Sequence, residues 1–272
     1  MFAAYSSPQG RVLALLHLLP HSSGIIAILP KELLAPTMAA LRKFVLRAKV
    51  TIEDTGERLC VAGAHEVRQL TSAGLAAPPS DLGYAEIDEI GVAGVHRDPS
   101  RYWVIGAAER LAEHGLAGDA DPGRLEHDWR LADIRAGLPQ IYLATRETFV
   151  AQMLNLDVLD GISFSKGCYT GQEIIARTQH LGRIKRRLYR LRLPRGEWRI
   201  GQTLQLSDGR AGRLVEAIDS DGGVEALAVL NVQAQTAEET DAGVIPSRES
   251  AEGDALAGSA VAASLLPLPY SI

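Results

Sequence analysis

The segment KGCYTGQE at residues 166–173 places an amine and a thiol two positions apart in a glycine-flanked run. Gly167 and Gly171 can adopt backbone angles that are closed to other residues, so the run predicts a tight functional turn and not a core strand. A nearby ammonium favours the thiolate, the form of cysteine that attacks electrophiles and binds metals. Lys166 and Cys168 are therefore the candidate catalytic residues.

The alternative for Cys168 is a small buried thiol, which is the usual state of a free cysteine. The second cysteine, Cys60, lies in the alternating run RLCVAG and is predicted to be strand core. Two cysteines without a CxxC spacing predict no disulfide framework and a reducing compartment, the cytoplasm. They are too distant in sequence, and the histidines too scattered, to predict a metal site.

Composition predicts a globular protein and limits its partners. The chain has 272 residues, of which 46% are hydrophobic and 22% are charged, enough to bury a sizeable core. The net charge of −5 argues against nucleic-acid binding by the whole surface, so any RNA contact must be local. The apolar run RVLALLHLLP is too short to span a membrane and lacks a basic region before it, so no membrane association is expected.

The elements around the motif follow an α+β pattern. Arg11–Leu19 and Ile25–Leu29 predict a hairpin, and Lys31–Val45 predicts a core-facing helix. Beyond residue 50, short strands are expected at Thr51–Glu53, Arg58–Val61 and Tyr102–Ile105, with helices near Glu66 and Ala107. A helix is expected over Leu125–Ala136, with a stop at Gly137.

After the motif, the pattern changes to short strands. Tyr189, Leu191 and Leu193 alternate with Arg190 and Arg192, the period of two that is typical of a strand. The further strands are expected at Thr203–Leu206, Ala211–Ala217 and Val224–Leu230, with a last strand near Val261. Glycine-rich turns separate them, so the sequence predicts a small antiparallel β-barrel. The polar, acidic stretch 234–258 predicts a flexible loop.

A basic run extends from Arg177 to Arg199 and allows three interpretations. It is a solvated strand face, an anchor for an anionic ligand tail, or a contact for RNA phosphates. Its cations are Arg177, Arg183, Lys185, Arg186, Arg187, Arg190, Arg192, Arg195 and Arg199. Arg177 follows the motif 166–173 and is expected on the same strand, facing the ligand pocket.

The stretch FVAQMLNLDVLDGISFSKGCYTGQEIIARTQHLGRIKRRL, residues 149–188, resembles the signature of the YgfZ family, folate-binding relatives of the glycine-cleavage T-protein (aminomethyltransferase). The blocks AAYSSPQGRVLA, LRKFVLRAKVTIED, WRLADIRAGLPQI and LPLPYSI occur in the order that such proteins show. The similarity therefore spans nearly the whole chain.

This resemblance implies an α+β fold with an aminomethyltransferase-like folate-binding domain at 1–187, including a ferredoxin-like lobe at 50–118. A C-terminal antiparallel β-barrel is expected at 188–272. It implies an accessory protein without a defined reaction that binds tetrahydrofolate or a folate derivative. Its expected partners are iron–sulfur proteins that it helps to assemble or repair, such as a tRNA methylthiotransferase. In that role Cys168 would handle sulfur, iron or an oxidised intermediate.

Two other functions remain open. A folate-dependent one-carbon transferase would need an acidic residue near the folate and a docking surface for a lipoyl protein, and neither is evident. An RNA-binding module would use the basic run 177–199. Cys168 discriminates the first two functions, because transfer of the T-protein type does not rely on a cysteine in this motif.

The resemblance also implies a folate site. Trp129 precedes IRAGLP where the family has a folate-contacting tryptophan, and an aromatic face suits a flat pterin. A helix tryptophan is otherwise more often core. The remaining candidates for folate contacts come from the signature stretch: Tyr169, Gln172, Glu173, Arg177 and Asp157.

The chain departs from the family in two places. T-protein relatives often carry glutamate where this chain has Arg135, which has no acceptor for the amino-pyrimidine edge of a pterin. Glu173 or Asp157 is then the alternative acceptor. Family members also have residues before the block AAYSSPQG. We therefore expect an incomplete sheet here, with Val12, Leu15 and Leu16 uncovered and the chain prone to pair with another copy.

Overall fold

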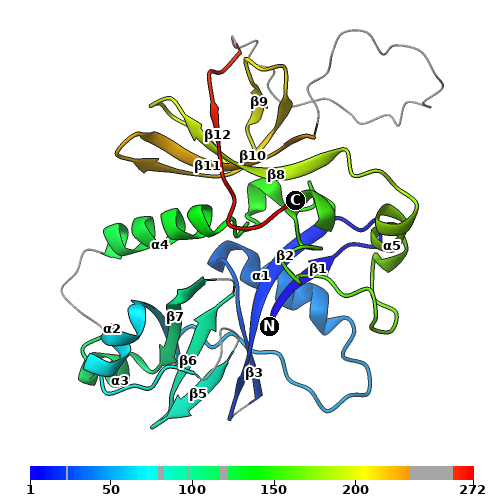
Figure 1. Cartoon of the computed structure of the whole chain (residues 1–272). Coiled ribbons are helices and arrows are strands. Elements are labelled where there is room, and N and C mark those ends of the chain that lie inside the picture. Colours follow the sequence, from blue (N-terminus) through cyan, green and yellow to red (C-terminus); the bar gives the residue numbers. More distant parts are fainter. Residues whose placement is uncertain (23, 79–82, 97, 117–121, 233–259) are drawn as a thin grey trace.

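The computed structural model describes residues 1–22, 24–78, 83–96, 98–116, 122–232 and 260–272, and it has the expected α+β architecture (Figure 1). The described strands form three antiparallel sheets of three, four and five strands. The predicted loop at 234–258 lies outside the described residues. The part of the chain that the structure describes has no helix long and apolar enough to cross a membrane.

The first sheet has the order β1-β2-β3. Its elements are β1 (Phe2–Ser6), β2 (Val12–His21) and β3 (Gly24–Ile28), followed by helix α1 (Lys31–Arg42). The expectation that β2 would lack cover is wrong. It pairs with a strand on each side, and Val12 and Leu15 are fully buried. The residues that precede β2 are enough to supply one of those partners.

The second sheet has the order β4-β7-β6-β5, with short helices packed on it. Its elements are β4 (Cys60–His65), α2 (Glu66–Ser72), β5 (Tyr84–Ile87), β6 (Ile90–Val95), β7 (Asp98–Gly106) and α3 (Ala108–Glu113). The predicted strand at 51–53 does not form. Cys60 is exposed, so its assignment to the core was wrong. Alternation puts it on the same face as buried Ala64, but it begins an edge strand, where its side chain stays in solvent.

The third sheet has the order β12-β8-β11-β10-β9. Its strands are β8 (Arg186–Leu193), β9 (Thr203–Gln205), β10 (Ala211–Ser220), β11 (Gly223–Asn231) and β12 (Ser264–Leu266). An isolated bridge joins Val261, just before β12, to Leu206, just after β9. This bridge connects the two edges of the sheet, which confirms the predicted barrel. Tyr189, Leu191 and Leu193 face its core, as the alternation predicts.

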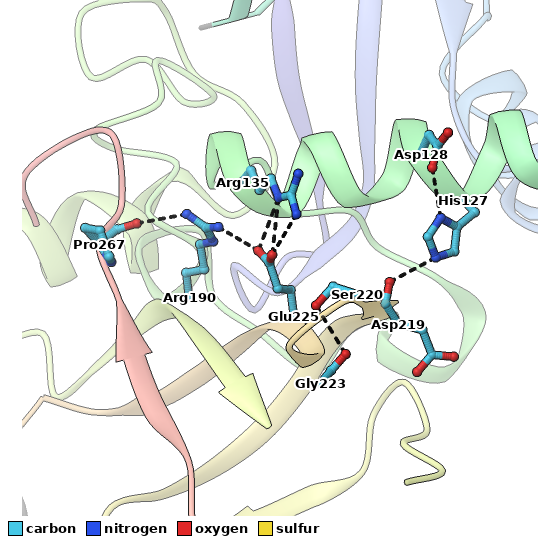
Figure 2. Close-up of polar contacts among 9 residues, drawn as sticks. All are labelled: His127, Asp128, Arg135, Arg190, Asp219, Ser220, Gly223, Glu225 and Pro267. Atoms are coloured by element: carbon cyan, nitrogen blue, oxygen red, sulfur yellow. Dashed lines mark hydrogen bonds and ion pairs between the residues drawn. The ribbon is translucent and has the colours of Figure 1, made fainter. Parts of the chain in front are cut away.

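Helix α4 (Pro122–Ala136) lies between the second sheet and the barrel (Figure 1). It ends at Gly137, whose φ of +68° is a left-handed angle that stops a helix. Toward the barrel, Arg135 and Arg190 both donate to the buried carboxylate of Glu225, and His127 contacts the main-chain oxygen of Asp219 (Figure 2). Helix α4 therefore connects the second sheet to the barrel.

The largest hydrophobic core is shared by the first sheet, α4, the barrel and the chain between α4 and β8. That connecting chain contains two 3-10 turns, η1 (Leu143–Thr145) and η2 (Ala151–Leu154), and then helix α5 (Gln172–His180). Buried Ile175 anchors α5 in this core. The segment that contains the cysteine motif is thus held on a rigid base.

Candidate functional site

The motif 166–173 begins as an irregular turn, as predicted, but its last two residues already belong to helix α5, which was not predicted. Gly171 caps the helix at φ +82°, where other residues are strained. A Cβ on Gly171 would lie 2.5 Å from the main-chain oxygen of Ser7, and one on Gly10 would lie 3.0 Å from Cβ of Ile174. At Gly171 the motif turn therefore packs directly on the backbone of the turn between β1 and β2, whereas Gly10 leaves room for the side chain of Ile174.

Cys168 is exposed in this turn, so the alternative of a buried thiol is wrong. The Lys166 ammonium lies 4.7 Å from the centre of the Tyr169 ring, a cation–π contact that fixes the amine on the turn. The Tyr169 hydroxyl is buried, has no hydrogen-bond partner in the described part of the chain, and its burial raises its pKa. The turn thus presents the Cys168 thiol to solvent, two positions after a lysine whose ammonium is held against Tyr169.

The other predicted residues of the signature stretch point to different places. Gln172 and Glu173 lie in the first turn of α5. Arg177 is exposed on α5, so its expected position on a strand was wrong. Both oxygens of Asp157 accept hydrogen bonds from Arg187, at 2.6 and 2.8 Å. Because its carboxylate is occupied and largely buried, Asp157 has little capacity to accept from a ligand.

Trp129 packs between α4 and the second sheet. Gly63 of β4 makes room for it, since a Cβ there would overlap the six-membered ring of Trp129. The ring centre of Trp103 lies 4.5 Å from that of Trp129, and the Arg101 guanidinium lies 4.6 Å above the ring. The Nε1–H groups of both tryptophans are buried and find no hydrogen-bond partner among the residues that the structure describes. The faces of Trp129 are therefore largely covered, whereas two indole donors remain unsatisfied.

Asp133 is a residue of this cluster that the sequence analysis missed. It follows Trp129 by four positions, so both lie on one face of α4. Arg101, 1% exposed, donates to Asp133 Oδ1 at 2.8 Å and to Asp98 Oδ2 at 2.7 Å. Among the described residues, Oδ2 of Asp133 accepts no hydrogen bond. Burial raises the pKa of Asp133 to about 6, although Arg101 acts in the opposite direction.

Arg135 has a structural partner. It donates to Glu225 Oε1 at 2.9 Å, and Arg190 donates to Oε2 at 2.6 Å (Figure 2). Burial of Glu225 acts against ionisation, but these two arginines keep its pKa below the usual value. Arg135 therefore attaches α4 to the barrel.

Trp103, Trp129, Arg101 and Asp133, here called the tryptophan cluster, are separate from the motif turn. Trp129 and Tyr169 both pack against the largest core. Within the part of the chain that the structure describes, no hydrogen bond, ion pair or ring contact joins Trp129 to the motif residues. No group of three or more His, Cys, Asp or Glu side chains placed to hold a metal ion occurs among those residues either.

Comparison with known proteins identifies relatives over most of the chain. The chain matches no family model. It is 30% identical over 245 residues to the tRNA-modifying protein YgfZ of Yersinia pestis, which covers 85% of this chain and 73% of that protein. It is 31% identical over an alignment of 287 positions to the tRNA-modifying protein YgfZ of Pectobacterium carotovorum, which covers 100% of this chain and 80% of that protein.

A solved structure has the same fold. The glycine cleavage system aminomethyltransferase T of Bartonella henselae superposes with a TM-score of 0.58 and 15% sequence identity. The match covers 85% of this chain and 67% of that protein. It confirms the aminomethyltransferase-like fold.

Proposed function

Because the chain belongs to the YgfZ family, whose relatives above are named tRNA-modifying proteins, we propose that it is a folate-binding accessory protein of tRNA modification. Its clients are iron–sulfur enzymes such as a tRNA methylthiotransferase, and Cys168 is the group that acts on them. The observation that carries this proposal is the exposure of Cys168 on a turn that Gly171 packs against Ser7. Lys166, two positions before Cys168, is held on the same turn by Tyr169. A reactive thiol must be accessible, and the turn supplies that access.

The tryptophan cluster has the donors and acceptors that a reduced folate requires. The amino-pyrimidine edge of a pterin donates hydrogen bonds, and Asp133 Oδ2 offers a free acceptor close to Trp129. The carbonyl and ring nitrogens of a pterin accept hydrogen bonds, and Trp103 and Trp129 each hold a buried donor that no described residue accepts from. Tetrahydrofolate, when bound, supplies a one-carbon unit or a reducing ring. Asp133 would then replace the family carboxylate that Arg135 does not provide.

The fold of the Bartonella aminomethyltransferase keeps one-carbon transfer as a second candidate function. Both candidate functions require the binding of reduced folate, which a single experiment tests. Titration of the purified protein with reduced folate, followed by tryptophan fluorescence, should quench Trp103 and Trp129, which lie together, more than Trp198, which packs in the barrel. A chain that shows no saturable change would have no folate-dependent function of either kind.

We predict that Asp133→Asn weakens the binding of reduced folate about tenfold at pH 7.5, because the amide replaces a charged acceptor by a neutral one. The pKa of about 6 gives this prediction a pH signature. Below pH 6 the native carboxyl is protonated, so the affinity of the unmodified protein should fall as pH drops from 7.5 to 5.5. The asparagine variant should have a flat profile. Parallel profiles for the two proteins would contradict the assignment.

We further predict that Trp129→Phe weakens folate binding by about 1 kcal/mol, the scale of one hydrogen bond. Phenylalanine keeps an aromatic ring against Gly63 and Arg101 but removes the indole donor. Trp129→Ala removes the ring that packs against Gly63 and Arg101 together with the donor, so the loss should be at least as large, on the order of 1 to 3 kcal/mol. Trp198→Phe is the matched control, because the indole of Trp198 already donates a hydrogen bond to the main-chain oxygen of Pro194. Dissociation constants that do not change in either Trp129 variant would restrict Trp129 to a packing role.

A further inference from the structure

Exposed cations are concentrated in the segment that contains Cys168, residues 163–186, whose surface is here called the α5 surface. Five cations in this segment are exposed: Lys166, Arg177, Arg183, Lys185 and Arg186. Glu173 is the one carboxylate in the same stretch of sequence. Since the whole chain carries a net charge of −5, the positive charge on this surface is a local concentration. An ordinary solvated face mixes charges of both signs.

Ion pairing removes two cations of the basic run, Arg187 and Arg190, from those that a partner can reach. Arg187 is bound by Asp157 and Arg190 by Glu225, so both cations are neutralised inside the fold. Lys166, Arg177, Arg183 and Lys185, in contrast, form no ion pair within the described part of the chain. Their charges are available to a partner.

Local contacts hold the α5 surface together. The Phe164 ring from the motif turn lies 6.1 Å from the His180 ring at the end of α5. The Gly182 amide donates to the Arg177 carbonyl, which folds the following turn back onto the helix. The motif turn, α5 and the residues that lead to β8 therefore lie together at one end of the molecule (Figure 1). Phe164 is 37% exposed, which adds an aromatic side chain to the cations.

We propose that the α5 surface binds the phosphate backbone of RNA and places it beside Cys168. This inference rests on the proposed function and deepens it, because it makes tRNA a direct partner. Phosphates accept hydrogen bonds from Arg and Lys without regard to sequence, and unpaired cations next to an exposed aromatic ring suit a nucleic acid. An acidic protein also complements positive charge, but it would gain less from Phe164.

The expected affinity is modest and depends on salt. Each neutralised phosphate contributes about −0.9 to the slope of log K against log salt, so four contacts give a slope near −4 and a loss on the order of a hundredfold between 50 and 200 mM salt. Binding of a fluorescent tRNA transcript should therefore be measured by anisotropy at low salt and then titrated with salt.

The decisive comparison uses two double variants with the same change of charge. Arg183→Glu with Lys185→Glu alters the α5 surface. Arg195→Glu with Arg199→Glu alters exposed cations beyond the other end of β8. We expect the first pair to bind tRNA at least tenfold more weakly with a slope reduced by about two, and the second to stay within threefold of the unmodified chain. No binding by the unmodified chain, or equal losses in the two pairs, would overturn the proposal.

A cross-linking experiment locates the RNA. A benzophenone maleimide attached to Cys168 in a Cys60→Ala background should cross-link to the tRNA transcript. The same probe on Cys60 in a Cys168→Ala background should not, although both thiols are exposed. The reverse pattern would place the RNA elsewhere and refute the assignment.

Two further measurements separate this inference from the proposed function and from a protein partner. The α5 double variant should keep the folate affinity of the unmodified chain, since neither residue belongs to the tryptophan cluster. A chain that binds tRNA but no folate would refute the folate role and leave the RNA surface intact. An α5 double variant that keeps tRNA binding but loses tRNA methylthiolation in cells would refute the RNA surface and indicate an acidic protein partner.

Discussion

Cys168→Ala is expected to abolish tRNA methylthiolation by the iron–sulfur client in a host strain that lacks its own YgfZ and carries this chain. The reason is chemical, because alanine removes the exposed thiol from a turn whose backbone is fixed by packing on Ser7. The side chain is in solvent, so the free energy of unfolding should change by less than about 0.5 kcal/mol. The measurement is the methylthio-modified fraction of tRNA, with circular dichroism as the check on folding.

Cys60→Ala is the matched control. Cys60 is also exposed, so solvent access alone does not distinguish the two thiols. The difference is that Cys168 has the Lys166 amine in its turn, whereas Cys60 begins an edge strand of the second sheet. Full support by Cys60→Ala is expected. Full support by Cys168→Ala, or equal loss in both variants, would remove the cysteine from the proposed function.

Arg101→Met is expected to lower the free energy of unfolding by about 3 to 5 kcal/mol at pH 7.5. Arg101 is 1% exposed and binds the carboxylates of Asp98 and Asp133 together with the main-chain oxygen of Trp129. Methionine fills similar volume but leaves two carboxylates without their cation. Urea denaturation measures the loss.

The pH dependence of this loss has a definite sign. The pKa of Asp133 is already raised by burial to about 6, above its value in an unfolded chain, and loss of Arg101 should raise it further. The folded variant therefore binds a proton more tightly than the unfolded chain, so its stability relative to the parent recovers as pH falls from 7.5 toward 5. A deficit that stays constant or grows on acidification would contradict this explanation.

Arg58→Met provides the control for burial. Arg58 and Glu53 also form an ion pair at 2.8 Å, but their side chains are 66% and 59% exposed. Exposed pairs contribute between about 0 and 1 kcal/mol, so this variant should unfold close to the parent. An equal cost for the two substitutions would mean that the Arg101 network is no more important than a surface pair.

Local signals in the sequence predicted much of the backbone. The turn that begins the motif 166–173, the helix that stops at Gly137 and the alternation of Tyr189, Leu191 and Leu193 all formed as expected. These features depend on glycine conformations and on short periodicities, which neighbouring residues determine. The likeness of residues 149–188 to one family likewise needed no structure.

Exposure was harder to predict, because it depends on which other elements cover a segment. Cys60 has the alternation of a core strand but begins an edge strand, and it is exposed. Arg177 lies on a short helix, because Gly171 starts α5 directly after the motif turn. Val12 and Leu15 are buried, because β1 and β3 flank β2 on both sides. For Cys60, Val12 and Leu15 the exposure depends on which strands lie beside their own, and those strands come from other parts of the chain.

The sequence by itself determined the family, the α+β class, the barrel and the thiol on its turn, because each has a signature within a short stretch. Only the tertiary structure showed that Arg101 binds both Asp98 and Asp133 against the ring of Trp129, although Asp133 follows Arg101 by more than thirty positions. Only the tertiary structure showed which cations of the basic run are ion-paired inside the fold. Arg187 and Arg190 pair with Asp157 and Glu225, whereas Arg183 and Lys185 are exposed. Electrostatic partners are chosen by distance in space, and spacing along the chain does not encode that distance.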